Sequence, residues 1–259
     1  MKSQKLPVKL GKEPLIDVVC GVGLDCAQPI DTFIPGLLLK KLDGKQPIFE
    51  ALPAAGIPAE VRAVALPSQN TPLMRVIVDS QFVVLIGQKW LGVACQMPYA
   101  GWESFRPMIE KVFSVISEAP FINSIERYSL KYVDFLPKRD DCAPLDFFNL
   151  KIDLAGRRLK GEPTQLRAEI SDQPFVHILT VLSQVRLNRV LPPVAPKAPL
   201  SSDGSILDVD TQRIADAMPV SAFLENLPTL LDEIHFANKQ FFFDLLSESG
   251  LSDLDPHYD

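Results

Sequence analysis

The stretch that most constrains the fold runs from residue 73 to residue 137, because its hydrophobic period changes twice. It opens with three short apolar segments separated by tight-turn residues, which predicts an antiparallel meander. These segments are residues 74–78, 82–86 and 89–97. Apolar side chains then recur every three or four residues from Trp102 to Ile116, which predicts a helix that Pro120 ends. From Ile125 the period returns to two, and this alternation predicts a half-buried strand.

The same patterns predict further elements on both sides of this stretch. The predicted strands are residues 15–25, 166–170, 175–187 and 205–211. We expect the strands at residues 166–170 and 175–187 to pair through a turn at Asp172-Gln173-Pro174. The strongest helical pattern is the last one, where Ser221 can cap a short first turn and Asn226 can cap again, with Pro228 just inside. Its apolar face consists of Leu227, Leu230, Leu231, Ile234, Phe241, Phe242, Leu245 and Leu246.

Four regions have weaker patterns. The proline-rich region Pro29–Pro72 predicts a mostly extended covering segment, with a short helix at residues 33–42 and a strand at residues 61–66. The other regions are residues 1–13, a loose lead-in, residues 191–200, a stiff surface loop, and residues 251–259, a mobile acidic tail.

The order of these elements predicts the fold class. Strands, a helix, further strands and a final helix follow one another, which predicts an α+β fold with long helices packed on one face of an antiparallel sheet or sheets. The order also suggests two related strand-rich halves, residues 1–137 and 138–259, each with one long helix. A single compact domain is the alternative.

Composition limits the classes of protein. Of the 259 residues 47% are apolar and 22% are charged, so the chain can bury a full core. A net charge of −6 argues against a nucleic-acid-binding surface that covers the whole molecule. The amino terminus lacks an apolar signal segment and no window is long enough to span a membrane, so we expect a soluble cytoplasmic protein. Four scattered cysteines predict buried thiols in a reducing compartment.

Motifs for catalysis are missing. The sequence has no phosphate-binding loop, no serine-hydrolase elbow and no histidine pair at metal-ligand spacing, so it favours a protein that is not an enzyme and holds no cofactor. His177 lies on a predicted strand between apolar neighbours, which favours a structural role.

Two alternative functions rest on small groups of charged residues. Asp208 and Asp210 share one side of a strand and, with His235, could bind a divalent metal in an enzyme. A pair of this kind more often faces water. The other alternative is nucleic-acid binding through a basic group, of which three members follow Gly156 at a predicted hairpin tip; such tips are usually solvated. This group is Arg127, Lys131, Arg157, Arg158 and Lys160.

Short motifs spread over nearly the whole chain carry a resemblance. They are PLIDVV at 14–19, FVVLI at 82–86, Pro98-Tyr99 followed by Trp102 and Phe105, RYSLKYVD at 127–134, Asp208-Val209-Asp210, and Leu231-x-x-x-His235 with Phe242. Together they resemble a sporadically distributed bacterial family of about the same length whose members are uncharacterised. The family pattern has arginine before the Tyr132 position and asparagine at position 134, where this chain has Lys131 and Asp134. Its patchy distribution implies mobile or accessory genes, defence systems among them, and implies no reaction.

These observations favour a non-catalytic accessory or adaptor protein. A well-patterned core without a convergent catalytic group, a long proline-rich segment and an acidic tail suggest that the chain acts by binding another protein. Self-association into a homo-oligomer is one form that this binding could take, and a membrane is not an expected partner.

Overall fold

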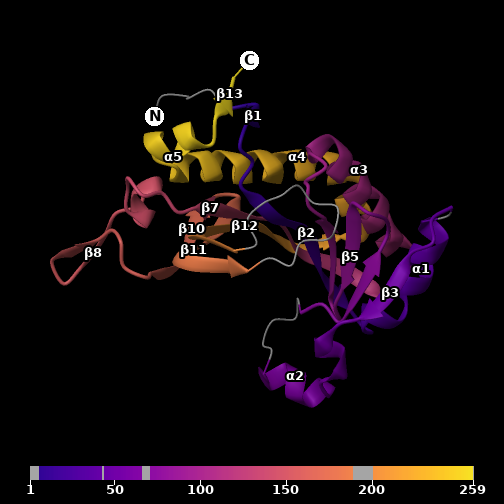
Figure 1. Cartoon of the computed structure of the whole chain (residues 1–259). Helices are drawn as coiled ribbons and strands as arrows, with labels where there is room; N and C mark the ends of the chain where they lie inside the picture. Colours follow the sequence, from indigo (N-terminus) through magenta and orange to yellow (C-terminus); the bar gives the residue numbers. More distant parts are fainter. Residues whose placement is uncertain (1–5, 43, 66–70, 189–200, 259) are drawn as a thin grey trace. The chain divides into compact units, whose positions relative to one another are not determined.

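The computed structural model describes residues 6–42, 44–65, 71–188 and 201–258 and has an α+β fold (Figure 1). Nine strands form one antiparallel sheet in the hydrogen-bonded order β10-β11-β12-β7-β2-β6-β5-β4-β3, and the long helices α3 and α4 pack against strands. The predicted fold class is therefore confirmed.

The chain divides into two compact units. The meander unit comprises residues 17–131 and 211–235, and the terminal unit comprises residues 1–16, 132–210 and 236–259. Four long elements belong in part to each unit: β2 (Leu15–Cys26), β7 (Ile122–Pro137), β12 (Ser201–Pro219) and α4 (Val220–Leu245). The limits of the units differ from those of the predicted halves 1–137 and 138–259, because these elements continue across the boundaries. A duplication that relates the halves stays a prediction.

The meander unit contains the strands that the hydrophobic alternation predicts. Its other elements are η1 (Ile30–Thr32), α1 (Ile34–Lys41), β3 (Ile48–Ala51), η2 (Pro53–Gly56), α2 (Ala59–Ala65), β4 (Met74–Ile77), β5 (Phe82–Ile86), β6 (Trp90–Cys95), α3 (Trp102–Phe113) and η3 (Ser114–Glu118). Val76, Val84 and Val93 lie opposite one another on β4, β5 and β6, and all three are fully buried. This row of β-branched side chains explains why the alternation specifies the register.

Aromatic side chains join the helices of the meander unit to its strands. Phe223 of α4 lies 6.4 Å from Phe113 of α3 and 5.8 Å from Tyr128 of β7, measured between ring centroids. Phe105 and Ile109 of α3 are also fully buried. The apolar face predicted between Trp102 and Ile116 is therefore a core face.

The predictions for Pro29–Pro72 are partly wrong. The short helix predicted at 33–42 is present as α1, but the region is not mostly extended, because it also contains the helical elements η1, η2 and α2. The predicted strand at residues 61–66 is instead part of α2 over its described residues. Ala59, Glu60 and Arg62 are good helix formers, and they outweigh the two valines that suggested a strand.

The terminal unit has its own core. Its other elements are β1 (Lys9–Leu10), η4 (Pro144–Phe147), β8 (Ile152–Leu154), β9 (Arg157–Leu159), β10 (Gln165–Asp172), β11 (Phe175–Asn188), α5 (Glu248–Asp253) and β13 (Pro256–His257). The predicted pairing of residues 166–170 with 175–187 is confirmed, and Asp172 pairs with Phe175 at the turn. Apolar side chains from η4, β11, β12 and the second half of α4 form the core of this unit, among them Phe147, Leu179, Val209 and Phe242.

The prediction that the final helix is capped a second time is wrong. The final helix does not begin again at Asn226: α4 is continuous, Pro228 lies inside it, and the Asn226 side chain donates a hydrogen bond to the carbonyl of Ala222 within it. Burial of Phe223 and Leu227 on the two sides of this region stabilises the continuous helix.

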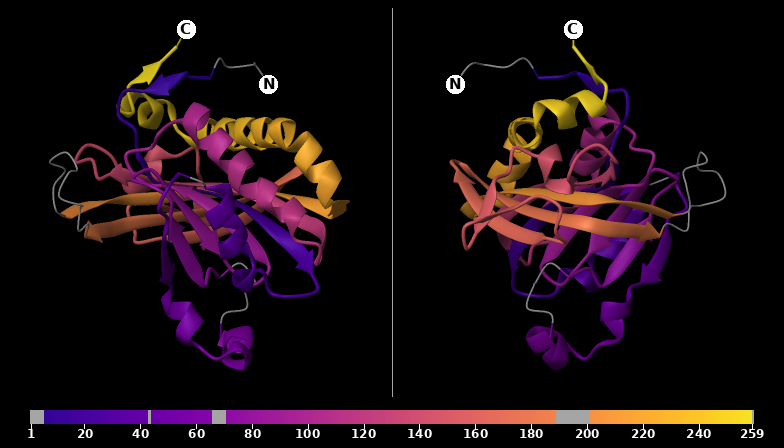
Figure 2. Two further views of the ribbon diagram at one scale, coloured as in Figure 1. Left: turned by 90° about the vertical axis from the view of Figure 1, so that its right-hand side faces the viewer. Right: turned by 60° about the vertical axis from the view of Figure 1, so that its left-hand side comes forward.

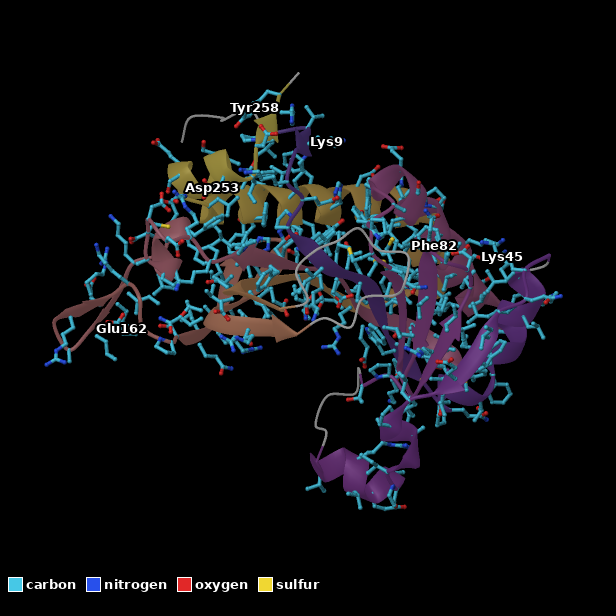
Figure 3. All side chains as sticks on the ribbon, viewed as in Figure 1. Lys9, Lys45, Phe82, Glu162, Asp253 and Tyr258 are labelled. Atoms are coloured by element: carbon cyan, nitrogen blue, oxygen red, sulfur yellow. The ribbon has the colours of Figure 1, made fainter. Side chains whose placement is uncertain are left out.

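The acidic tail is ordered over its described residues. Ser247 caps α5 by accepting a hydrogen bond from the amide of Gly250, and β13 pairs with β1 so that His257 lies opposite Lys9 (Figure 2). The predicted loose lead-in at residues 1–13 therefore contains the strand β1. Figure 3 marks Lys9 of β1 and Tyr258, which follows β13. The predicted surface loop at residues 191–200 lies outside the described residues.

Two whole-chain expectations can be compared with the structure. Within the described part of the chain, no helix is both long and apolar enough to cross a membrane. All four cysteines are described and are free thiols; Cys20, Cys26 and Cys95 are buried as predicted, whereas Cys142 is partly exposed.

Candidate functional site

The open edge of β3 is the surface of the meander unit that is best suited to binding. β3 is the last strand in the order of the sheet and pairs with β4 on one side, from Ile48 opposite Ile77 to Ala51 opposite Met74. Among the described residues, no strand pairs with its other side. An unpaired strand edge presents backbone donors and acceptors that an extended segment of another chain can use.

The register shows which backbone groups face this open edge. The amide of Leu52 donates to the carbonyl of Leu73 at 2.8 Å, so these two residues form a hydrogen-bonded pair just beyond β3. Hydrogen-bonded and non-hydrogen-bonded pairs alternate along an antiparallel ladder. Glu50 therefore directs its backbone groups toward β4, whereas Phe49 and Ala51 direct theirs toward the open edge.

The side chains on this edge are apolar and exposed. Ile48 is 58% exposed and Phe49 is 37% exposed. Shortly after β3 the chain forms α2, where Val61 is 51% exposed and Val64 is 84% exposed. Residues i and i+3 share one face of a helix, so the two valines lie together. Figures 1 and 2 show η2 and α2 standing away from the strands of their own unit.

The charges near β3 are compensated. Glu50 of β3 lies opposite Arg75 of β4, and the two form an ion pair. Lys45, marked in Figure 3, forms an ion pair with Asp79 in the turn between β4 and β5. Partial burial opposes the ionisation of Asp79, but the hydrogen bonds from Lys45 and from two backbone amides outweigh it and lower the pKa of this carboxyl. Local ion pairs therefore balance the polar groups beside the edge, and the exposed apolar side chains are its distinctive feature.

The residues of the predicted basic group belong to two different units. Arg127 and Lys131 lie on β7 in the meander unit, and the aliphatic stem of Arg127 lies against Gly23, where a Cβ atom would meet Arg127 Cγ at 2.9 Å. Arg157 and Arg158 lie on β9 beside the tip of the β8–β9 hairpin in the terminal unit, and Lys160 follows β9 at the base of the hairpin. The predicted hairpin is confirmed, with Ala155 and Gly156 at its tip in the left-handed conformation.

Carboxylates accompany the basic residues of the hairpin. Arg158 donates to Asp153 at 2.6 Å from directly across the strand pair, and the backbone amide of Lys160 donates to Glu162, which is marked in Figure 3. Only Arg157 and Lys160 therefore add positive charge that these two contacts do not offset.

The predicted metal ligands also belong to different units. Asp208 and Asp210 are half-buried on β12 in the terminal unit, and they alternate with the buried side chains of Leu207 and Val209. His235 belongs to the meander unit, where its ring stacks on Trp102 with centroids 4.1 Å apart. Among the described residues, no group of three or more histidine, cysteine, aspartate or glutamate side chains is placed to hold a metal ion.

His177 is part of the core of the terminal unit. It is fully buried, and its ring stacks on Phe241 of α4 at 4.1 Å. Burial lowers the pKa of His177 and outweighs the opposite effect of Asp172, whose carboxylate lies 3.7 Å from Nε2. A neutral stacked imidazole agrees with the structural role that the sequence predicts.

Asp134 is a buried acid to which the sequence analysis assigns no functional role. It is 4% exposed, and burial, with smaller contributions from Glu13 and Asp208, raises the pKa of its carboxyl to about 8. The signal was available, because the alternation places Asp134 on the same strand face as the buried Tyr128 and Leu130.

Comparison with known proteins adds no further information about the site. No family model matches the sequence, and no curated protein matches it. The resemblance to an uncharacterised bacterial family stays a prediction.

Proposed function

We propose that the protein is a non-catalytic adaptor that binds another protein by adding an extended segment of that partner to the open edge of β3. The observation that carries this proposal is the exposure of Ile48 and Phe49 on the terminal strand of the sheet. Sheet edges in soluble proteins are often protected by charged side chains or proline, whereas the large exposed side chains of the short strand β3 are apolar.

Backbone and side-chain chemistry together support strand addition. The backbone groups of Phe49 and Ala51 face outward and would form the new ladder. Ile48 lies on the opposite face of the strand from Phe49, so an added strand would gain an apolar contact on each face. Burial of one such side chain contributes about 1.5–3 kcal/mol. The partner segment therefore has exposed backbone groups and apolar side chains. The family resemblance suggests an accessory or defence-associated setting.

A proline substitution in the full chain tests this mode of binding. Ala51→Pro removes an outward amide but leaves the ladder between β3 and β4 unchanged, because the amide of Ala51 does not face β4. The wild-type and variant chains serve as baits in a lysate of the native host, with and without nuclease, and the captured proteins are identified by mass spectrometry. We expect a stoichiometric protein that survives nuclease with the wild type and is lost with Ala51→Pro.

The matched control lies on β10, the strand at the other end of the sheet order. Thr164 and Ser183 form a hydrogen-bonded pair next to β10, so the amide of Ser171 faces outward by the same alternation. Ser171→Pro is expected to retain the partner. Retention of the same partner by Ala51→Pro would overturn the proposal, and so would partners that disappear on nuclease treatment, which would favour the nucleic-acid alternative. Capture of the chain itself would identify the partner as a second copy.

A further inference from the structure

A cavity of about 440 Å³ opens in the terminal unit, where β7 ends beside the start of β12 and the end of β11. This volume is in the range typical of small-molecule sites. Its floor includes the buried side chains of Leu136 and Phe147. Gly204 lies on the same floor, where a Cβ atom would meet the Leu136 carbonyl, so the close approach of these strands needs glycine.

The charged lining of the cavity is mostly cationic. Lys138, Arg139 and Arg186 line it, with Asp203 as the acidic lining residue. Arg139 is held by ion pairs to Asp141 and to Asp253 of α5, so its charge is already compensated. Lys138 and Arg186 are therefore the cations available to a ligand.

The contact between Arg186 and Asp203 leaves room for a second acceptor. Arg186 donates from Nε at 2.9 Å and from Nη2 at 3.4 Å, while a guanidinium group carries five N–H donors, so Nη1 can bind another anion. The two side chains are 68% and 49% exposed, so water screens their attraction. The Lys138 amide also donates to the Asp203 carbonyl at 2.8 Å, which holds the segment of Lys138 beside the acid that Arg186 contacts.

We propose that this cavity binds a small organic anion. Lys138 and Arg186 hold the anionic group, a carboxylate or a phosphomonoester, and an apolar body packs on Leu136 and Phe147. Both parts are needed, because exposed cations alone bind simple anions weakly and the apolar floor gives no charge preference. This inference does not rest on the proposed function of the β3 edge, and it names the class of ligand that the terminal unit binds.

Phenyl phosphate serves as the probe, with inorganic phosphate and phenol as its two halves. Calorimetry on the full chain is expected to show tighter binding of phenyl phosphate than of either half. Lys138→Gln removes a charge-assisted contact and is expected to weaken binding roughly tenfold. Asp203→Asn removes the acid that competes for Arg186 and is expected to tighten binding several-fold. A gain of affinity cannot result from misfolding. Arg158→Gln, on the β8–β9 hairpin of the same unit, is the control and is expected to bind like the wild type.

Cys142 provides an independent readout because it lines the cavity and is the one partly exposed cysteine of the chain. Bound phenyl phosphate is expected to slow its alkylation by iodoacetamide at mildly alkaline pH. The proposal is overturned if phenyl phosphate binds no more tightly than phosphate, if Lys138→Gln and Asp203→Asn bind like the wild type, or if a saturating ligand leaves the alkylation rate of Cys142 unchanged.

Discussion

The two strands at the ends of the sheet order place their charges differently. β10 is eight residues long and carries Arg167, Glu169 and Asp172, with Arg167 and Glu169 in an ion pair at 2.8 Å. β3 is four residues long, and its one charged side chain, Glu50, pairs with Arg75 of the neighbouring strand. Charges on β10 oppose the addition of another strand, whereas the exposed Ile48 and Phe49 of β3 favour it. Side-chain chemistry therefore distinguishes an edge that is protected from one that can bind.

Each unit also contains a carboxyl with a perturbed pKa, and the two shifts have opposite signs. Asp79 in the meander unit has a lowered pKa because hydrogen bonds to its charged form outweigh partial burial. Asp134 in the terminal unit has a pKa raised to about 8, mainly by burial. The contributions of these two carboxyls to stability should therefore depend on pH in opposite directions.

The largest predicted effect is that of Asp134→Asn on stability. Between about pH 4 and pH 8 the unfolded chain releases the Asp134 proton while the folded chain keeps it, so stability is fully present below pH 4 and falls as pH rises. At pH 7 this term amounts to roughly 4 kcal/mol. We expect urea denaturation to show that Asp134→Asn removes most of this decline. An unchanged pH profile would contradict the raised pKa.

Asp79→Asn is the counterpart in the meander unit. Its folded pKa is lowered, so its contribution to stability is present above the unfolded pKa and is lost as pH falls through the folded pKa. Asp79→Asn is therefore expected to destabilise the chain at pH 7 and to have less effect in acid, measured by the same denaturation series. Equal effects at both pH values would show that hydrogen bonding to the charged form is not the cause of the shift.

Proline substitutions at adjacent positions test the geometry of the β3 edge. Glu50→Pro removes an amide that faces β4 and should cost about 3 kcal/mol, of the order found for proline within regular structure. Ala51→Pro removes an outward amide and should cost much less. Thermal unfolding of the two variants, with Glu50→Ala as a control for the lost ion pair, measures the difference. Similar losses for Glu50→Pro and Ala51→Pro would mean that the backbone alternation is assigned wrongly.

Lysine substitutions test whether the exposed apolar side chains of β3 distinguish its edge from that of β10. Ile48→Lys places a charge on the exposed edge of β3 and should lower partner capture at least tenfold, with stability changed by less than about 0.5 kcal/mol. Ile170→Lys makes the same change on β10, where Ile170 is 37% exposed, and should leave capture unchanged. Equal loss of the partner with both variants would remove the distinction between the edges.

The smallest predicted effect comes from removing the charged side chains that protect β10 against the addition of another strand. Replacement of Arg167 and Glu169 by valine gives this strand an apolar edge like that of β3, because both side chains are exposed. We expect concentration-dependent self-association by analytical ultracentrifugation and little change in stability, since exposed ion pairs contribute little. A variant that associates no more than the wild type would show that charge does not protect this edge.

Much of the fold could be predicted from the sequence because hydrophobic periodicity is a local property. The row of Val76, Val84 and Val93 and the helical spacing of Phe105, Ile109 and Phe113 each identify a buried face without knowledge of the partner. Predictions were wrong where local signals conflicted with packing. Pro228 and Asn226 suggested a break in the last helix, and burial of Phe223 and Leu227 keeps that helix continuous.

By itself, the sequence determined the α+β class, the meander, the β10–β11 pairing and the lack of known catalytic motifs, because these depend on residue type and spacing. Only the tertiary structure decided that β3 ends the sheet order, that Asp134 is buried, and that Lys138 and Arg186 line one cavity. Exposure, pKa and the convergence of charges depend on segments that are distant in the chain, and no local pattern specifies which of them will meet.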